Sequence, residues 1–425
     1  MGNYSEISRR RFLARTTLAA GAAIPAFIPS RVLGANDRIQ VGIIGVGGRA
    51  NLLIDQLPQP GQIVALADCC LSRCEEAAGR RSKDWDIYQD YRRILDRKDI
   101  DAVIVATEDH ARVIPCIHAC QAGKDVYAEK PLTLYPGEGS VLVRAARKYK
   151  TVFQVGSQQR SMEMNQIACK LVRTGGLGKI KLAQGVNYPD AGLIPDLAEE
   201  PTPHELDWNV WQGQARARAY NNKLRFDWVR YQDYSGGETT NWGAHGIDQI
   251  QWALGMDGTG PVEFQPMEDP QGAVAFRYAN GVDVHLDLLY PSNGVEQPLM
   301  GGGRFIGEKG SIDIWRNNFK IDAPGIELEL PPPEEIEKWH DKRALWQAEY
   351  HMGFWLQCIG TREKPNADVE IGHRSVSVCH LANIARRLNR KIQWDPEKEE
   401  VVGDQEANLL AVDRPRRKGW ELPKI

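Results

Sequence analysis

Short apolar runs alternate with segments of helical periodicity over residues 37–160. This alternation is typical of βαβ units, in which covering helices join the strands of one parallel sheet. Strands buried on both faces are almost wholly apolar, so we predict a doubly wound α/β domain. Its predicted strands are Ile39–Ile44, Ile63–Ala67, Ala102–Ala106, Val126–Ala128 and Thr151–Val155. Helices are predicted between them at Asn51–Leu57, Cys69–Arg81, Tyr91–Arg97, Val113–Ala122 and Gly139–Tyr149.

The pattern changes after residue 160. Asp283–Leu289 alternates between polar and apolar positions, with the period of two that a half-exposed strand requires. We predict an α+β domain with a mostly antiparallel sheet over residues 161–395, whose C-terminal helices could pack back on the first domain, and a charged tail over 396–425. Its strands are predicted at Lys181–Val186, Gly272–Tyr278, Val282–Leu289, Gly303–Ile306 and Ser311–Ile314. Its helices are predicted at Asn165–Arg173, Leu345–Ile359 and Gly372–Leu388.

Tryptophans are concentrated between Asp207 and Trp252. Indole rings suit both a core under long loops and a surface on which a sugar ring stacks. Both interpretations remain open from the sequence.

The first 35 residues do not have the pattern of a folded domain. Ser8-Arg-Arg-Arg-Phe-Leu13 precedes a moderately apolar stretch, Leu18–Ile28, and then Gly34-Ala35. A charged start, a short apolar region and small residues are typical of an export signal, and the paired arginines resemble a twin-arginine signal. The stretch is too short to span a bilayer, so we expect periplasmic export without a membrane span; an ordered N-terminal arm is the alternative.

A glycine-rich turn follows the first predicted strand. Gly45, Gly47 and Ala50 form G-x-G-x-x-A between a strand and a helix. The first glycine permits a tight turn, the second lets the backbone approach a pyrophosphate, and the alanine lets the helix pack closely on the strand. We expect a dinucleotide here, and the alternative is a glycine turn in another kind of α/β domain.

The identity of the dinucleotide depends on the second strand, which ends in Asp68. A carboxylate at this position can bind the ribose 2′-OH of NAD and would repel the 2′-phosphate of NADP. Arg73 on the next predicted helix leaves NADP open. Gly48 and Arg49 complete the predicted cofactor loop.

Bulk composition excludes several other classes of protein. A chain of 425 residues is too long for one ordinary core, and 42% hydrophobic residues are typical of a globular protein. The net charge of −3 comes from interspersed acids and bases, so we expect no nucleic-acid partner. The eight cysteines include no Cys-x-x-Cys pair and the histidines form no ligand cluster, so we expect buried thiols and no metal.

Polar residues follow two of the predicted strands at the edge where a doubly wound sheet binds its ligand. Thr107 and His110 follow one strand, and Glu129-Lys130-Pro131 follows another. Lys130 beside a cofactor could hydrogen-bond a substrate hydroxyl and help to move its proton, and burial would lower its pKa. Glu129 could position the lysine or bind the cofactor; a surface Glu-Lys-Pro turn is the alternative.

A second candidate segment is Gly236–Asp248. Asn241 and His245 are four residues apart and Asp248 is three further, so one helix face can present all three. His245 is the best general base by its ordinary pKa, and Asn241 could hold it or the substrate. A capped helix start with a core histidine is the alternative.

The glycine turn, Glu129-Lys130-Pro131 and the segment with Asn241 and His245 together resemble the glucose–fructose oxidoreductase/inositol dehydrogenase (Gfo/Idh/MocA) family. The resemblance covers nearly everything after residue 37, and Pro365–Arg374 resembles an exported branch common in planctomycete-like bacteria. It implies a Rossmann domain, and a larger domain with an open sheet that forms the interface of a homo-oligomer, a dimer or tetramer. It also implies oxidation or reduction of sugar or cyclitol hydroxyls with NAD or NADP.

The same resemblance implies residue roles. The family's lysine falls on Lys130 and its histidine on His245, whereas its usual aspartate is Asn241 here, which cannot take up a proton. Asp248 matches a further acidic position of the family. The substrate residues implied in this way are Gln158, Arg160, Tyr188, Asp190 and Asp248.

Three functions remain after this comparison. The first is an exported sugar or glycoside dehydrogenase in which His245 is the general base, Lys130 relays a proton and NAD stays tightly bound. The second is an NAD-dependent glycoside hydrolase or lyase that works by transient oxidation and elimination. The third, a non-enzymatic dinucleotide- or sugar-binding protein, is disfavoured because Lys130 and His245 are both present.

Overall fold

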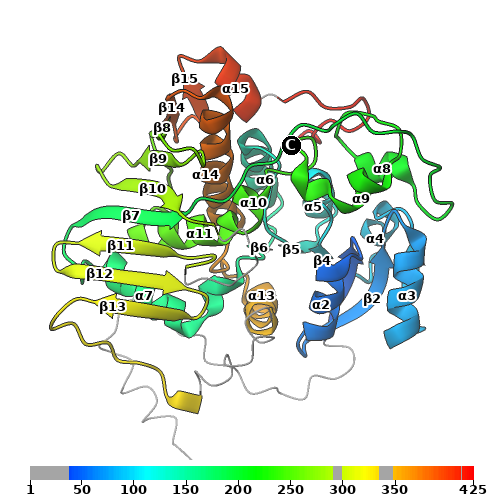
Figure 1. Ribbon diagram of the computed structural model, residues 1–425. Coiled ribbons are helices and arrows are strands. Elements are labelled where there is room, and N and C mark those ends of the chain that lie inside the picture. The colour runs from blue at the N-terminus through cyan, green and yellow to red at the C-terminus, as the bar shows by residue number, and fades with distance from the viewer. Residues whose placement is uncertain (1–37, 291–298, 335–347, 413) are drawn as a thin grey trace, which may run out of the picture. The chain divides into compact units, whose positions relative to one another are not determined.

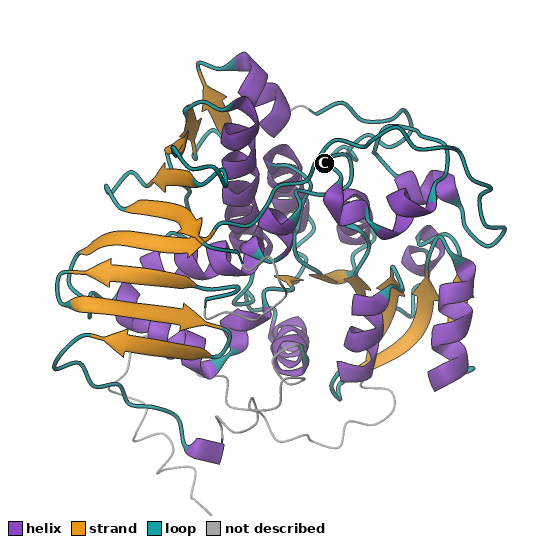
Figure 2. Cartoon of the chain, in the orientation of Figure 1, coloured by secondary structure: helices purple, strands orange, loops and turns teal. Residues whose placement is uncertain are grey.

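Two sheets organise the computed structural model, which describes residues 38–290, 299–334, 348–412 and 414–425 (Figure 1). The predicted export signal at residues 1–35 lies outside the described residues. Helices lie beside both sheets, as Figure 2 shows. In the described part of the chain, no helix is long and apolar enough to cross a membrane. All eight cysteines are free thiols, and seven of them are buried.

The first sheet confirms the predicted doubly wound fold. Its strand order is β3-β2-β1-β4-β5-β6, and every neighbouring pair is parallel. The strands are β1 (Ile39–Ile44), β2 (Gly61–Ala67), β3 (Asp86–Tyr88), β4 (Ala102–Val105), β5 (Asp125–Ala128) and β6 (Phe153–Val155). The helices are α2 (Gly48–Gln56), α3 (Leu71–Arg81), α4 (Arg92–Leu95), α5 (Val113–Gln121) and α6 (Pro136–Lys148). Since the order reverses between β1 and β4, a crevice is expected at their carboxyl ends.

The second sheet has nine strands in the order β13-β12-β11-β7-β10-β9-β8-β14-β15. Only the β7–β10 pair is parallel, so the mostly antiparallel prediction is confirmed. The strands are β7 (Ile180–Val186), β8 (Glu263–Pro266), β9 (Val274–Arg277), β10 (Asp283–Leu288), β11 (Gly303–Gly307), β12 (Gly310–Trp315), β13 (Asn318–Asp322), β14 (Ile392–Asp395) and β15 (Glu400–Val402). The buried side chains of α7 (Glu163–Arg173), α11 (Gly243–Leu254) and α14 (Val369–Leu388) share a core with this sheet.

Late segments of the chain complete the first core. Met352 and Trp355 of α13 (Glu349–Thr361) are buried against β1, β2 and β4. Gly372 on α14 lies so close to β6 that an added Cβ would come within 2.5 Å of Val155 Cγ2. The predicted boundary at residue 160 therefore divides a core that is shared, because these returning helices cover the Rossmann sheet.

Residues 396–425 differ from the charged tail that we predicted. They contain β15 and α15 (Gln405–Ala411), because the apolar side chains Val401, Ala407 and Ala411 are buried in the second core. Further on, Arg417 N donates to Gln214 O over 3.1 Å, and Leu422 and Ile425 pack against the Rossmann core. Some of the charged side chains of this segment also make inward contacts, since Arg416 donates to Gln214 Oε1 at 2.9 Å and Glu399 pairs with the buried His373 at 2.8 Å.

The segment 187–237 forms a covering layer with its own apolar cluster. It contains α8 (Trp208–Gln212), α9 (Asn222–Phe226) and the 3₁₀ turn η4 (Trp228–Arg230). Trp208 and Trp211 stack at 4.5 Å between ring centroids, so these two indoles serve packing. Backbone bonds such as Asp207 N to Cys69 O, 2.8 Å, fix the layer beside the end of β2.

A buried ion pair joins the turn η3 (Gln158–Ser161), which follows the Rossmann sheet, to α11 of the second domain. Arg160 donates to both carboxylate oxygens of Asp248 at 2.9–3.1 Å, and Ser375 Oγ donates to the same carboxylate at 2.7 Å. Both charged side chains are almost fully buried. Such a pair need not add stability by its presence, but removal of one member leaves a charge buried and uncompensated.

We therefore expect Asp248→Ala to lower the free energy of unfolding by about 3–5 kcal/mol, because Arg160 would keep only its more exposed partner Asp257. The measurement is urea unfolding followed by tryptophan fluorescence. The matched control is Asp283→Ala, which breaks the exposed pair with Arg277 and should change stability by less than about 1 kcal/mol. Equal losses of unfolding free energy in the two variants would contradict a structural role for the buried Arg160–Asp248 pair.

Candidate active site

A cavity of about 390 Å³ lies where the carboxyl ends of β1, β4 and β5 face the start of α11. It receives side chains from both domains and from the covering layer. Among the described residues, it is lined by Gly47, Gly48, Arg49, Arg73, Ala106, Thr107, Glu108, Asp109, Arg112, Glu129, Lys130, Pro131, Gln158, Arg225, Phe226, Trp228, Val229, Asn241, Trp242, His245 and Arg316.

The glycine turn has the geometry that a dinucleotide needs. Gly45 has φ +84°, and an added Cβ would lie 2.7 Å from Thr107 N, so this tight turn requires glycine. Gly47 and Gly48 line the cavity, and a Cβ on either would meet no atom within 4 Å. The helix α2 starts there without a side-chain cap or an acidic residue in its first turn. This cradle of open backbone at a helix N-terminus fits a pyrophosphate.

Asp68, which we predicted to bind the ribose, is engaged with the backbone of the glycine turn, and its ribose-binding role stays a prediction. Its carboxylate is buried and accepts the backbone N–H groups of Val46 at 2.6 Å and Cys70 at 2.8 Å, which fixes the glycine turn. Arg73 Nη1 lies 3.8 Å from Asp68 and 3.9 Å from Glu108. Arg73 and Glu108 line the cavity. Two carboxylates beside Arg73 keep this corner from presenting a free positive charge.

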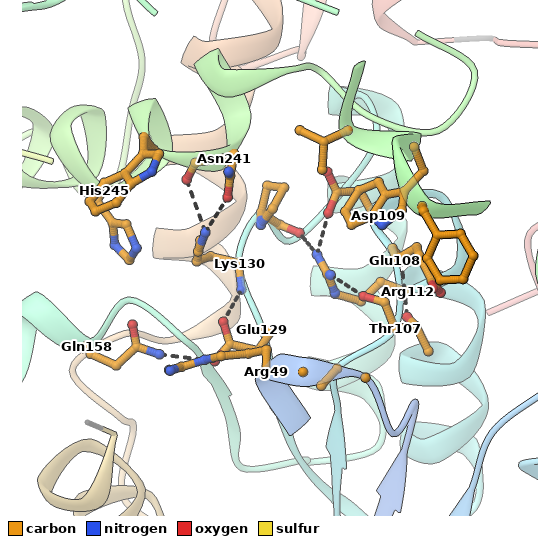
Figure 3. Close-up of a pocket in the computed structure, with 18 of the residues that line it drawn as sticks. Arg49, Thr107, Glu108, Asp109, Arg112, Glu129, Lys130, Gln158, Asn241 and His245 are labelled. Atoms are coloured by element: carbon orange, nitrogen blue, oxygen red, sulfur yellow. Dashed lines mark hydrogen bonds and ion pairs between the residues drawn. The ribbon is translucent and has the colours of Figure 1, made fainter. Parts of the chain in front are cut away.

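Glu129 is a buried anion at the junction of three elements. Its Oε1 accepts Arg49 Nε at 2.9 Å and Gln158 Nε2 at 3.0 Å, and its Oε2 accepts Lys130 N at 3.3 Å (Figure 3). Burial raises the pKa of Glu129, but Arg49 and Lys130 more than offset this and hold the pKa below its usual range. Glu129 is thus an ionised support that directs the residue after it.

Arg112 ties the ends of two strands together. Its guanidinium donates to the carbonyl oxygens of Thr107 after β4 and of Pro131 after β5, and its Nη1 lies 3.4 Å from Asp109 Oδ1 (Figure 3). Asp109 in turn accepts Ser235 Oγ of the covering layer at 2.8 Å. These contacts set the Lys130-Pro131 turn, which contains a cis peptide bond, relative to Thr107.

The amine of Lys130 crosses from the Rossmann domain to the second domain. Its Nζ donates to Asn241 Oδ1 at 2.9 Å and to Asn241 O at 3.1 Å, at the end of the short helix α10 (Glu238–Asn241) (Figure 3). Burial lowers the pKa of Lys130 to about 8, although the carboxylates Glu129 and Asp109 oppose this shift. The lysine can therefore gain or lose a proton near neutral pH.

His245 lies one helical turn beyond Asn241 in the same cavity (Figure 3). Burial and then the cations Arg316 and Lys130 lower the pKa of His245 well below its usual value, so its imidazole is neutral. Arg316 Nη2 lies 3.4 Å from His245 Nε2. Because an arginine has no acceptor, this contact requires an unprotonated Nε2.

Seven of the predicted site residues lie outside the cavity lining, namely Gly45 of the glycine turn and Asp68, both described above, and five others. His110 is packed between Trp211 and Tyr234, its Nε2 lies 2.7 Å from Trp211 O, and burial lowers its pKa to about 4. The other four are predicted substrate residues engaged in structural contacts. Arg160 pairs with Asp248, Tyr188 OH accepts Gly301 N at 3.0 Å, and Asp190 is bound by Arg387 at 2.5 Å.

Other residues of the cavity were not predicted. Arg112 follows Thr107 closely, so its place after a strand end was a usable signal. Arg316 lies in the hairpin turn between β12 and β13, 71 positions from His245, and no local pattern places it there. Arg225, Phe226 and Trp228 come from the covering layer, whose course the sequence does not define.

Comparison with known proteins agrees with this geometry. Residues 39–157 match the Gfo/Idh/MocA oxidoreductase family in its NAD-binding Rossmann fold, and residues 192–422 match its C-terminal alpha/beta domain. The chain belongs to the Gfo/Idh/MocA family. Members of this family include NAD-binding oxidoreductases similar to sugar and cyclitol dehydrogenases.

Individual relatives are distant. Inositol 2-dehydrogenase of Salmonella typhimurium is 24% identical over 182 residues, which are 41% of this chain and 54% of that protein. The chain thus spans about half the length of that relative. The 2,7-anhydro-N-acetylneuraminate hydratase of Mediterraneibacter gnavus is 31% identical over 172 residues, 40% of this chain and 38% of that protein. The structure of a levoglucosan dehydrogenase in complex with NADH and levoglucosan shares the fold, with a TM-score of 0.62 and 18% identity over 84% of this chain and 99% of that one.

The environment of Lys130 generates a test that needs no substrate. We expect its reaction with cyanate, followed by peptide mass spectrometry, to have a midpoint near pH 8, because burial lowers the pKa of its amine to about 8. Asn241→Asp replaces an amide at 2.9 Å with a carboxylate and should move the midpoint above about pH 9. Exposed lysines of the same sample give the reference curve. A midpoint for Lys130 that coincides with that of the exposed lysines would contradict the lowered pKa of its amine.

Proposed function

We propose that the protein is an NAD-dependent dehydrogenase that acts on a hydroxyl group of a sugar, glycoside or cyclitol. The observation that carries this proposal is one cavity in which Lys130 and the neutral His245 face the open glycine turn. Two proton-accepting groups next to a dinucleotide cradle are what oxidation of an alcohol requires. The relation to inositol 2-dehydrogenase and the fold of levoglucosan dehydrogenase support the substrate class.

The residues divide the work as follows. His245 Nε2 accepts the hydroxyl proton while the C–H bond breaks and a carbonyl forms. Lys130 hydrogen-bonds the same oxygen, and Asn241 holds its amine in position. The dinucleotide, when bound, supplies the nicotinamide ring that takes the hydride, with Gly47 and Gly48 holding its pyrophosphate. In the reverse direction the same groups return the proton.

NAD rather than NADP is proposed on electrostatic grounds. Arg73 could attract a 2′-phosphate, but Asp68 and Glu108 both lie within 4 Å of its guanidinium. A phosphate placed there would be repelled by two carboxylates, whereas the uncharged ribose of NAD would not be repelled.

A hydrolase or lyase cycle is the second candidate. Elimination beside a transient carbonyl needs a base for a C–H proton in addition to one for the hydroxyl proton, and the cavity contains both Lys130 and His245. The relative named as a hydratase also supports this candidate. In that cycle an aglycone leaves and no reduced dinucleotide accumulates.

The test is a panel of sugars, glycosides and cyclitols incubated with NAD and followed by mass spectrometry. A product lighter by two hydrogens supports the dehydrogenase, and aglycone release without NADH supports the second candidate. We expect His245→Ala and Lys130→Met each to lower turnover at least about 100-fold, because each removes a proton-transfer group. NADH binding, measured by fluorescence titration, should stay unchanged in both variants.

The control is Lys391→Met, which removes an amine paired with Glu263 on the second sheet, outside the cavity lining. It should leave turnover unchanged. Full activity of His245→Ala or Lys130→Met would remove that residue from the mechanism, and no conversion of any panel member would count against the proposed function.

Tight cofactor retention and export through the twin-arginine route are part of the proposal. Export is proposed from the arginine motif at Ser8–Leu13. Retention is proposed because an exported enzyme meets little free NAD. Retention is supported by the covering layer, which lines the cavity with Arg225, Phe226 and Trp228. Arg417 anchors this layer by donating to Gly213 O at 3.0 Å. The homo-oligomer stays a prediction.

We expect the purified protein to keep stoichiometric dinucleotide through gel filtration, measured by mass spectrometry of the acid-soluble fraction. Arg417→Ala should release the dinucleotide faster, because the bonds of this side chain to Gly213 O and Asn209 are lost. Arg390→Ala, which breaks an exposed pair with Asp404, should behave like the unmodified protein. A protein that arrives free of dinucleotide would contradict retention and leave the dehydrogenase proposal to the sugar panel.

A further inference from the structure

Asp109 is a buried carboxylate of the cavity with no part in the reaction described so far. It begins the turn η2 (Asp109–Ala111) after β4, is only 2% exposed and lines the cavity together with Lys130. Burial raises the pKa of Asp109 to about 6, although Arg112, Ser235 and Lys130 lower it, so the carboxyl group is mostly ionised at pH 7. A buried charge is costly unless donors compensate it, so the partners of Asp109 indicate what it does.

On one side, Asp109 is bonded to the covering layer. Ser235 Oγ donates to Asp109 Oδ2 at 2.8 Å, and the same hydroxyl oxygen accepts Gly237 N at 3.2 Å. Gly237 is the residue before α10, and its carbonyl oxygen accepts Asn241 N at 3.0 Å at the end of that helix. The carboxylate of Asp109 therefore fixes the start of the helix that presents Asn241 to Lys130.

On the other side, Asp109 supports the turn that carries Lys130. Its Oδ1 lies 3.4 Å from Arg112 Nη1, and the same guanidinium nitrogen donates to the carbonyl oxygen of Pro131, the residue after Lys130 (Figure 3). Arg112 is also buried, so its charge requires a carboxylate close by. Asp109 thus reaches both the turn that carries the amine and the helix that holds the acceptor of the amine.

The side chain of Asn241 is oriented for this amine. Its Nδ2 donates to Glu238 Oε2 at 3.1 Å, which leaves Oδ1 to accept Lys130 Nζ at 2.9 Å. The two acceptors of the amine, Asn241 Oδ1 and Asn241 O, are both uncharged. Neutral acceptors fix the position of an ammonium group, but they do not offset its charge.

The charge of the amine is offset by carboxylates that it does not touch directly. Burial is the largest influence and lowers the pKa of Lys130 to about 8. The charged groups around it are Glu129 and Asp109, which raise this pKa, and Arg49 and Arg316, which lower it. Glu129 is bonded on the Rossmann side, to Arg49 and to the backbone of Lys130, whereas Asp109 is bonded to the layer that leads to α10.

We propose that Asp109 is a positioning residue for the proton transfer at Lys130. Through Ser235 it holds the acceptor of the amine, through Arg112 it holds the turn that carries the amine, and its negative charge favours the protonated amine. The inference rests on the proposed function, in which this amine hydrogen-bonds the substrate oxygen. A displacement of about 1 Å can lower a rate about 100-fold, so a residue that fixes both ends of this hydrogen bond controls the reaction without touching the substrate.

Two substitutions separate the charge of Asp109 from its link to α10. Asp109→Asn keeps the shape of the side chain and an oxygen that can accept from Ser235, but removes the charge. Ser235→Ala keeps the charge but breaks the link to Gly237. The first readout is the reaction of Lys130 with cyanate, which needs no substrate.

We expect Asp109→Asn to lower the cyanate midpoint of Lys130 by about one pH unit, because a charge that raises the pKa of the amine is removed. Asp109→Glu should bring the midpoint back toward pH 8, and Ser235→Ala should move it less than Asp109→Asn does. A merely structural role would have the opposite sign. A loosened site would expose the amine to water and raise the midpoint toward that of the exposed lysines.

The matched control is Asp233→Asn, which removes a carboxylate two residues before Ser235, where it pairs with Arg218 at 3.0 Å outside the cavity lining. It should leave the midpoint of Lys130 and the turnover unchanged. Melting temperature and NADH fluorescence verify that each variant is folded. A midpoint in Asp109→Asn that stays at the value of the unmodified protein, or that rises, would overturn the inference.

Turnover separates this inference from the proposed function. With a substrate from the sugar panel, the ionisation near pH 8 in the profile of kcat/KM should move down by about one unit in Asp109→Asn. His245 does not titrate in this range, because its pKa lies well below its usual value. Ser235→Ala should lower kcat about 10-fold and leave NADH affinity unchanged.

The two failures are distinguishable. If the unmodified protein converts no member of the panel, the proposed function fails, and the cyanate midpoints still decide whether Asp109 supports the charge of Lys130. If the protein oxidises a sugar but both variants keep its turnover and pH profile, the dehydrogenase stands and the role of Asp109 is overturned.

Discussion

One buried carboxylate, that of Glu129, holds the parts of the site together. Water is excluded from it, so its charge is tolerable only because donors surround it. Arg49 comes from the helix after the glycine turn, Gln158 from the turn that leads to the second domain, and the third donor is the backbone of Lys130. A Cβ on the adjacent Gly156 would lie 2.8 Å from Glu129 Oε1, so the neighbouring backbone is fitted to this side chain. The glycine turn, the amine of Lys130 and the junction of the two domains thus share one support.

The parts of the fold that could be predicted from the sequence are those in which cause and effect are close in the chain. The strand–glycine–helix unit at Ile39–Gln56 is local, and its strand has the predicted bounds. Lys130 and His245 also reach the cavity, because the ends of adjacent parallel strands and the first turn of a helix are defined by short patterns. The short strands β3, β8, β13, β14 and β15 were missed, since three to five residues carry too weak a periodicity.

The remaining differences come from contacts across long stretches of chain. Asp68 has the spacing of a ribose-binding residue, yet its carboxylate satisfies the N–H groups of Val46 and Cys70, and no pattern distinguishes the two uses. Arg160 and Asp248 are polar residues next to a predicted site, but each is the other's partner across 88 positions. Arg316 illustrates the opposite case, because an ordinary hairpin arginine acquires a role only through the path of the whole sheet.

The contact between Lys130 and Asn241 has a consequence for the effect of pH. The lysine stands on one domain and its acceptor on the other, and the low pKa of about 8 depends on the burial that this contact accompanies. An arrangement in which the amine met water would bind a proton more tightly, by the difference between about 8 and the ordinary value of about 10.4. By linkage, protonation therefore favours any arrangement in which this amine meets water, and contact with water favours protonation. The acidity of the surroundings is thereby coupled to the contact between Lys130 and Asn241.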